Sequence, residues 1–452
     1  MKLIYNIKDK PSFGKLIVFA FQQMLAILAA TIAVPAIIGN GMSQSAALFG
    51  AGVGTIVYQL FTRFNSPVFL GSSFAFLGSM FAAFAGGVTA NLGYAGLFLG
   101  AVFAGLVYVV IALVVKIAGV NWINKLMPPV VIGPTVALIG LSLAGNAVKD
   151  AVGANAGVTA FDAGTSAYVM APKSWIMLIC ALVTLLTVML CSVFGKKMMK
   201  LIPFIIGILA GYVVAAIFTV IGIATGNDLF MIIDFTKFAN MQWYPDFTFL
   251  KAFAGFKEIN AQYIITIAVA YVPVAFVVFT EHIADHKNLS TIIDQDLLEK
   301  PGLHNTLLGD GVGSIAGAFF GGCPNTTYGE SVGCVAITGN ASVITITVTA
   351  IMAIVSSFVA PFVTFLATIP GCVMGGVCIT LYGFIAVSGL KMVQKVDLGE
   401  NRNLFVVASI LITGIGGLAL KIGPVTITNI ACALILGIIV NLILNKKDNK
   451  AE

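Results

Sequence analysis

The sequence predicts an all-α polytopic membrane protein with about fourteen transmembrane segments, because apolar windows of about 20 residues recur along the whole chain. Of the 452 residues, 59% are hydrophobic and only 9% are charged. Such a composition leaves too little polar surface to cover a water-soluble globule. A glycine-rich motif of the first half also returns in the second half, which indicates an internal repeat.

The expected segments fall into two sets separated by a polar loop. The first set lies at residues 15–38, 44–61, 67–88, 95–118, 129–148, 173–194 and 201–224. A connecting loop is expected over 225–260, and the second set lies at 261–284, 304–321, 323–339, 342–366, 371–393, 403–420 and 424–444. The first apolar run is too long for the apolar region of a signal peptide, so we expect it to be a retained span.

The internal repeat predicts how the two sets are oriented. The motif GAGVGTI at 50–56 returns as GDGVGSI at 309–315, an offset of 259 residues. The five-residue spacing of Pro128 and Gly133 returns in Pro370 and Gly375, at an offset of 242. Because each set holds an odd number of spans, the second copy must run with inverted topology. This is the plan of secondary transporters, in which broken elements of both halves form a site near the centre of the bilayer.

Two stretches are expected to interrupt helices within these spans. They are SPVFLGSSFAF at 66–76 and GGCPNTTYGES at 321–331. At membrane depth, the backbone groups that glycine and proline release must find partners within the protein. The alternation of Val68, Leu70 and Ser72 with their neighbours suits a short strand. We therefore expect two short strands, in broken segments 3 and 10, that pair with each other.

The distribution of basic residues predicts the orientation in the membrane. The net charge of +6 comes from residues scattered over short loops and tails, which does not indicate a nucleic-acid surface. With fourteen spans and both termini in the cytoplasm, eighteen Lys and Arg lie inside and six lie outside, as the positive-inside rule requires. The outside residues are Lys149, Lys173, Lys237, Lys251, Lys257 and Lys421. A multi-pass protein of the plasma membrane is expected.

The sequence offers little support for a metal-binding, redox or enzymatic function. The seven cysteines form no C-x-x-C pair or His-Cys cluster, so neither a metal site nor a redox motif is predicted. No pairing of a nucleophile with a base indicates an enzyme.

Two carboxylates stand within apolar runs that contain no Lys or Arg, namely Glu281 and Glu330. One interpretation is a structural carboxylate with a distant partner. The other is a site on a solute pathway, where intramembrane acids usually lie. A carboxyl group withdrawn from water takes up a proton more readily, so this pair could bind and release protons. It could also hydrogen-bond a small planar solute with alternating N–H and C=O groups.

Four further ionisable residues lie in or beside the same spans. Asp285 is one helical turn beyond Glu281 on the same helix face. Asp310 is expected to be a solvated cap near a helix start. His282 and His286 could relay protons, although a solvated surface position is the expectation for His286.

Several segments together resemble one known family. The stretch PNTTYGE at 324–330, followed by Gly333, closely resembles the signature of the nucleobase-ascorbate transporter family, also called nucleobase:cation symporter-2, and in particular its bacterial uracil permease branch. GSSFAF at 71–76, EHI at 281–283, PGLH at 301–304 and VMGGV at 373–377 also look like segments of this family, and they occur in the same order.

The resemblance implies a division into two domains and a transport activity. It implies a core domain built from 15–118 and 261–366, and a gate domain built from 129–224 and 371–444, within repeats at 1–224 and 261–452. It further implies uptake of a nucleobase coupled to protons, without a cofactor or a metal. The partners would be the nucleobase and the lipid bilayer, with no nucleic acid and with a homodimer as an open alternative.

The resemblance also implies roles for individual residues. Glu281 and Glu330 would hydrogen-bond the base, and the backbones of Phe74 and Gly329 would touch it. Glu281 would carry the coupled proton. The remaining candidates are Asp285 and His286 for proton coupling, and Gln22, Gln23, Asn325 and Ser331 as supporting residues.

The sequence departs from the family pattern at a few of these positions. Gln22-Gln23 stands where the family commonly has Gln-His, and Ser331 replaces an Asn of the uracil branch. Glu330 favours uracil, because similar purine transporters tend to carry Gln there. Asp285 and Gly339 keep a xanthine or other purine permease open. An anion transporter of the same plan would need Lys or Arg near 71–76 or 321–330, and the sequence has none.

Overall fold

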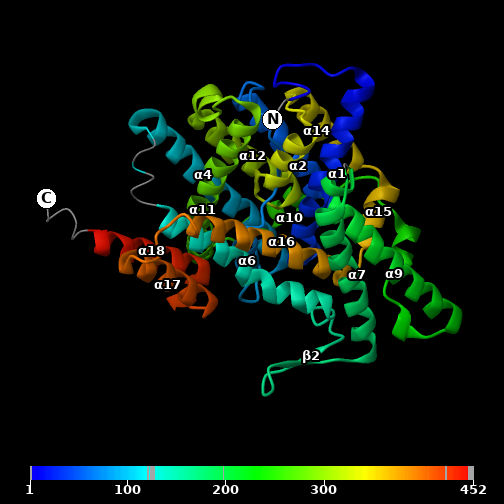
Figure 1. Ribbon diagram of the computed structural model, residues 1–452. Coiled ribbons are helices and arrows are strands. Elements are labelled where there is room, and N and C mark those ends of the chain that lie inside the picture. Colours follow the sequence, from blue (N-terminus) through cyan, green and yellow to red (C-terminus); the bar gives the residue numbers. More distant parts are fainter. Residues whose placement is uncertain (1–2, 120–121, 123–127, 197, 423–424, 446–452) are drawn as a thin grey trace.

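The computed structural model describes residues 3–119, 122, 128–196, 198–422 and 425–445, and it is almost entirely helical (Figure 1). Within these residues, seven helices are long and apolar enough to cross a membrane, or eight if a bent pair counts as one span. Counting the bent pair as one span gives eight crossings. The total is fourteen, as the sequence predicts, if one further crossing is made by each of α2, α12, the two broken elements and the last two helices.

The α-helices are α1 Phe13–Ile38, α2 Gln44–Phe61, α3 Leu77–Ala83, α4 Ala90–Ala118, α6 Pro129–Ala151, α7 Pro172–Phe194, α8 Met198–Leu201, α9 Pro203–Thr225, α10 Thr248–Gly255, α11 Ala261–Ile293, α12 Leu303–Gly321, α13 Gly329–Thr338, α14 Val343–Ser356, α15 Ala360–Thr368, α16 Gly371–Val393, α17 Asn401–Ile415 and α18 Asn429–Asn445. The shorter helical turns are η1 Asp228–Phe230, η2 Phe235–Asn240, η3 Phe256–Glu258 and η4 Leu298–Gly302. The strands are β1 Leu70–Ser72, β2 Ala160–Asp162, β3 Ala167–Val169, β4 Asn325–Thr327, β5 Leu420–Ile422 and β6 Val425–Ile427.

The two copies of the glycine motif pack against each other. A Cβ added at Gly54 would lie 2.7 Å from the carbonyl oxygen of Gly313, and one added at Gly313 would lie 2.7 Å from the carbonyl oxygen of Gly54. These two residues are related by the offset of 259 that the sequence shows. Helices α2 and α12 can approach this closely only because neither residue has a side chain. The reciprocal contact is what inverted repeats related by a pseudo-two-fold axis produce.

Helices α6 and α16 repeat this arrangement with the second offset. Gly133 packs against the carbonyl of Gly389, and Gly375 packs against the carbonyl of Ala147. Because 375 and 389 are 133 and 147 shifted by 242 residues, these two contacts are symmetry mates. The offset of 242 residues therefore relates residues that occupy equivalent positions in the two repeats.

Two glycines of α6 provide a test of this packing. A Cβ at Gly140 would lie 2.6 Å from the backbone nitrogen of Ala386, whereas Gly145 has no atom within 4 Å. We expect Gly140→Ala to destabilise the protein by about 1–3 kcal/mol, as overpacking does. Gly145→Ala should be neutral or stabilise it by up to about 1 kcal/mol, because alanine favours a helix. Thermal unfolding of the purified variants measures both, and equal midpoints would contradict the packing described for α6 and α16.

The two broken elements meet as predicted. Strands β1 and β4 pair antiparallel, with Gly71 opposite Thr326, and the ladder continues where the amide of Ser73 donates to the carbonyl of Pro324 at 2.9 Å. Both strands are fully buried, so pairing within the protein satisfies their backbones. Helix α3 follows the first strand and α13 follows the second, and each is shorter than a full span.

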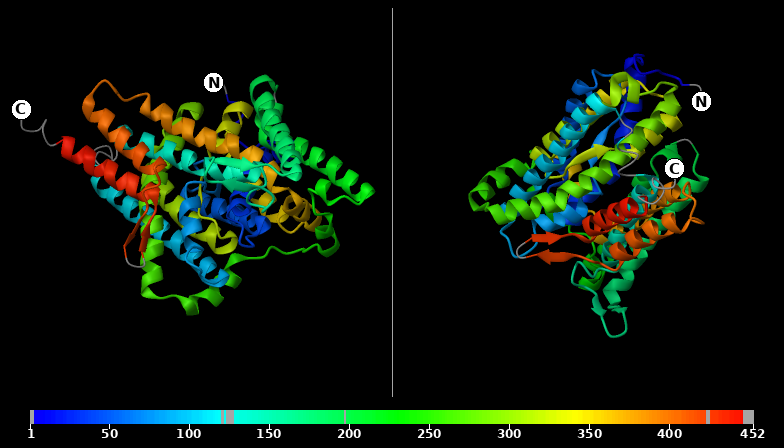
Figure 2. Two further views of the ribbon diagram at one scale, coloured as in Figure 1. Left: turned by 90° about the horizontal axis from the view of Figure 1, so that it is seen from below. Right: turned by 90° about the vertical axis from the view of Figure 1, so that its left-hand side faces the viewer.

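The helices form two groups (Figure 2, right). One group packs α1, α2, α4, α11, α12 and α14 around the β1–β4 pair, and the other packs α6, α7, α9 and α16–α18. Most of the interior belongs to one continuous apolar cluster. The paired strands lie where the two groups face each other.

Three expected boundaries differ from the structure. The span expected at 342–366 is bent by 83° between α14 and α15. Pro361 stands in the first turn of α15, where proline fits a new helix start but could not continue the preceding one. Helix α11 continues to Ile293, beyond the expected end at 284. The span expected at 403–420 ends at Ile415, since Gly416 and Gly417 terminate it, and the β5–β6 hairpin follows.

Hydrogen bonds join the connecting segments at each end of the molecule. At one end, the Lys8 ammonium donates to the carbonyl of Phe64 at 3.0 Å. At the other end, Lys237 donates to the carbonyl of Ala367 at 2.6 Å and Lys251 to that of Gly41 at 3.3 Å. The two residues of each pair are predicted to lie on the same side of the membrane. Of the basic residues used to predict the orientation, Lys2, Lys125, Lys197, Lys446, Lys447 and Lys450 lie outside the described residues.

Candidate functional site

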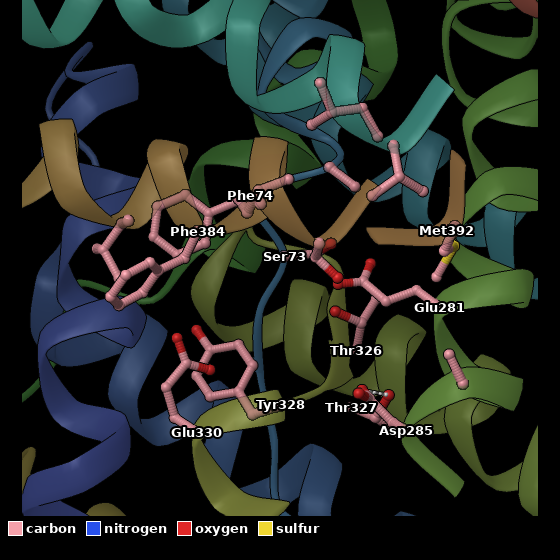
Figure 3. Close-up of a pocket in the computed structure, with 18 of the residues that line it drawn as sticks. Ser73, Phe74, Glu281, Asp285, Thr326, Thr327, Tyr328, Glu330, Phe384 and Met392 are labelled. Carbon is pink, nitrogen blue, oxygen red and sulfur yellow. Dashed lines mark hydrogen bonds between the residues drawn. The ribbon is translucent and has the colours of Figure 1, made fainter. Parts of the chain in front are cut away.

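A cavity of about 370 Å³ lies between the two groups of helices, beside the paired strands (Figure 3). Its polar wall is built from α11, from the residues that directly follow β1, and from residues of β4 and of the segment after it. Its opposite wall is built from α6, α9 and α16. The two broken elements therefore place polar groups at a depth where continuous helices would present only side chains.

Helix α11 contributes Glu281 and Asp285 to the polar wall. The two residues are four apart, so both face the cavity from successive turns of the helix. The hydroxyl of Thr327, from β4, donates to a carboxylate oxygen of Asp285 at 2.8 Å. Asp285 is thereby held against the strand, while the carboxylate of Glu281 points toward Ser73 and Thr326 (Figure 3).

Glu330 approaches the cavity from another side, beyond Tyr328 (Figure 3). It stands in the first turn of α13, where the helix dipole stabilises a negative charge. Among the described residues, no side-chain hydrogen bond or ion pair holds the carboxylate of Glu281 or Glu330. Both groups are therefore available to a solute, and a carboxylate without an ionic or side-chain partner in such a place indicates a functional site.

Aromatic residues complete the surroundings of the carboxylates. The hydroxyl of Tyr328 donates to the carbonyl of Ser72 at 2.8 Å, which fixes its ring beside Glu330. Phe74 makes an edge contact with Tyr382 of α16, with ring centroids 6.0 Å apart. Phe74 and Gly329 both line the cavity with Glu281 and Glu330. The structure thus brings together the four residues predicted to contact the solute.

The opposite wall is almost entirely apolar. It consists of Val136, Ile139, Phe204, Leu381, Phe384, Ile385, Ser388 and Met392. These residues could not be predicted from the sequence, because an apolar side chain that faces a cavity has the same pattern as one that faces lipid. The wall offers flat contact area and excludes water from the carboxylates.

The four supporting candidates do not line the cavity. The Gln23 amide donates to the hydroxyl of Ser331 at 2.5 Å, and that hydroxyl also accepts from the backbone amide of Phe69 at 3.1 Å. The amide of Asn325 donates to the carbonyl of Gly50 at 3.0 Å. These bonds fix the broken elements from behind. Gln22 faces away from the cavity, toward the sulfur of Met198.

The histidines and Asp310 differ from their expected environments. His286 is fully buried and shares a 2.7 Å hydrogen bond with the Tyr58 hydroxyl, so the expected solvated position is wrong. Asp310 lies in the middle of α12, buried, and pairs with His282 at 2.7 Å, so it is not a solvated cap. His286 is buried because α11 continues through the expected boundary at 284 and places this residue against Tyr58 of α2. Asp310 is buried because His282, which lies within the expected span, faces it from α11. His286 also lies outside the cavity lining.

The fold and the cavity together define a membrane transporter of the inverted-repeat class. The transmembrane domain of the cyanobacterial bicarbonate transporter BicA has the same fold, with a TM-score of 0.61 at 16% identity over 97% of this chain and 100% of that one. The murine anion transporter Slc26a9 matches with a TM-score of 0.64 at 12% identity over 98% of this chain and 69% of that one.

The chain belongs to the Permease family, whose model (Xan_ur_permease) matches residues 14–423. It is 39% identical to the uracil permease of Bacillus caldolyticus, over 100% of this chain and 97% of that protein. The uracil permease of Escherichia coli K12 is 33% identical, over 97% of this chain and 93% of that protein. These similarities over the full length confirm the resemblance that the sequence motifs indicated.

Proposed function

We propose that this permease imports uracil, or a closely related nucleobase, together with protons. The observation that carries the proposal is the pair of carboxylates, Glu281 and Glu330, which reach one cavity without an ionic or side-chain partner among the described residues. The names of the similar permeases supply the candidate substrate.

The chemistry of the cavity fits a small planar base. Uracil presents alternating N–H and C=O groups along its edge. A protonated carboxyl donates one hydrogen bond and keeps an acceptor, whereas an ionised carboxylate only accepts. Glu281 in its protonated form can therefore pair with both a C=O and an N–H, while Glu330 accepts from an N–H. The apolar wall from α6 and α16 covers the faces of the ring.

Transport follows from movement between the two groups of helices. The group around β1 and β4, built from 15–118 and 261–366, is the core domain, and the group built from 129–224 and 371–444 is the gate domain. The apolar wall uses Phe204 from the first turn of α9 and Met392 from the last turn of α16. With both termini cytoplasmic, these turns lie at the inner end, which is where the cavity would open in an inward-facing state of an alternating-access cycle.

Competition for uptake tests the substrate. Uptake of labelled uracil by cells that produce the protein should be suppressed by unlabelled uracil and much less by xanthine. A second candidate, a xanthine or other purine permease, is favoured by Asp285 and Gly339. Uptake of labelled xanthine that unlabelled uracil does not suppress, with no uptake of labelled uracil, would establish that candidate in place of the first. The anion alternative receives no support from the described lining, which includes no Lys or Arg.

A further inference from the structure

A second cavity, of about 600 Å³, lies at the opposite end of the molecule from the inner ends of α9 and α16. It is lined by the start of α2, by the end of α15 and by residues 236–246 of the segment that joins the two repeats. Most of the lining side chains are polar, in contrast to the apolar wall of the first cavity. Nothing in the proposed transport cycle uses this cavity.

The joining segment runs from the gate domain to the core domain (Figure 2, left), and its residues 236–246 contribute to the cavity lining. On the gate side, the backbone amides of Ile232 and Ile233 both donate to the hydroxyl of Thr219 in α9, at 3.1 and 3.0 Å. On the core side, α10 packs on α4 and α12, and Lys251 reaches the carbonyl of Gly41. The intervening residues pass α15, to which Lys237 is bonded. The cavity thus lies between the joining segment and the core domain, at the end of the molecule where a solute would arrive from outside.

The polar groups of the cavity include both an unused acceptor and a cationic donor. The side-chain oxygen of Gln44 is buried and has no hydrogen-bond partner among the described residues. The ammonium of Lys237 has three N–H donors, of which the carbonyl of Ala367 takes one. Tyr244, in the same lining, is 67% exposed and presents its ring.

These three groups together select one class of ligand. An inorganic anion would pair with Lys237 but has no N–H to offer Gln44. A cation would be repelled by Lys237, and the carboxylate of Asp246 in the same lining is already paired with Lys251. A flat heterocycle with N–H and C=O groups suits both, and it can stack on Tyr244 as bases do on aromatic side chains. We propose that this cavity is an outer entry site, which binds the transported base before it reaches Glu281 and Glu330. The inference rests on the proposed function.

The test is the dependence of initial uptake rate on external uracil concentration in intact cells. Tyr244→Ala and Gln44→Leu should each raise KM by about fivefold, the loss expected for weak stacking or a single hydrogen bond. The rate at saturation should not change, because neither residue touches the first cavity. Trp243→Ala is the matched control, since Trp243 is 62% exposed in the same segment but does not line the cavity. Its KM should equal that of the unmodified protein.

Binding to purified protein separates an entry site from a general structural defect. The tight Kd for uracil should be the same in Tyr244→Ala as in the unmodified protein, whereas a distorted first cavity would weaken it. Unchanged KM in both variants, or an equal rise in Trp243→Ala, would overturn the inference while leaving the proposed function intact. Absence of uracil uptake by the unmodified protein would overturn both.

Discussion

Glu281→Gln should abolish the proton-driven accumulation of uracil. The amide has nearly the same size as the carboxyl group, and Glu281 has no bonded partner among the described residues whose loss would disturb α11. An amide cannot take up and release a proton, so the coupled step is lost. The variant should bring internal uracil no higher than the external concentration, at every pH between about 5 and 8, where proton coupling is usually measured.

Accumulation of labelled uracil in cells or proteoliposomes measures this effect. Glu299→Gln is a matched control, because Glu299 is exposed and lies away from both cavities. The control should accumulate uracil as the unmodified protein does. Accumulation by Glu281→Gln to the normal level, with the normal pH dependence, would show that Glu281 does not carry the coupled proton.

Glu330→Gln should weaken uracil binding by about tenfold or more, since a hydrogen bond to a charged group contributes about 1.5–3 kcal/mol. Glu330 reaches the cavity from the first turn of α13, and its carboxylate can accept from an N–H of the base. Gln presents a donor in place of one acceptor, so the preferred edge of the ligand changes. The loss for uracil should therefore exceed any loss for xanthine.

Equilibrium binding of uracil and xanthine to the purified variant decides between these effects. A Kd for uracil that rises more than the Kd for xanthine supports a direct contact between Glu330 and the base. Equal weakening for both ligands would indicate a general disturbance of α13. Unchanged Kd values for both would remove Glu330 from the binding site.

The repeat and the broken elements could be predicted because they depend on local chemistry. Glycines at matching positions, such as Gly54 and Gly313, mark places where helices touch, and the structure confirms that these two touch each other. Proline and glycine at 66–76 and 321–331 mark backbone that cannot remain helical in lipid. The pairing of β1 with β4 follows from the need to satisfy that backbone.

Other features depend on tertiary packing that the sequence does not show. The apolar wall of the cavity has no pattern that distinguishes it from lipid-facing surface. The burial of His286 could not be predicted either, because α11 continues beyond its apolar run and places this residue against Tyr58 of α2. The burial of Asp310 depends on its pairing with His282 of another helix, which has no local signal. The 83° bend between α14 and α15 has a local signal in Pro361, but proline in a membrane helix does not always break it.

We propose that the cavity couples the binding of a nucleobase to proton movement. The most direct measurement is the external pH of a weakly buffered suspension of proteoliposomes when uracil is added without any imposed gradient. The medium should become more alkaline as uracil enters, and Glu281→Gln should abolish this change. Entry of uracil with no change in external pH would contradict proton coupling through this site.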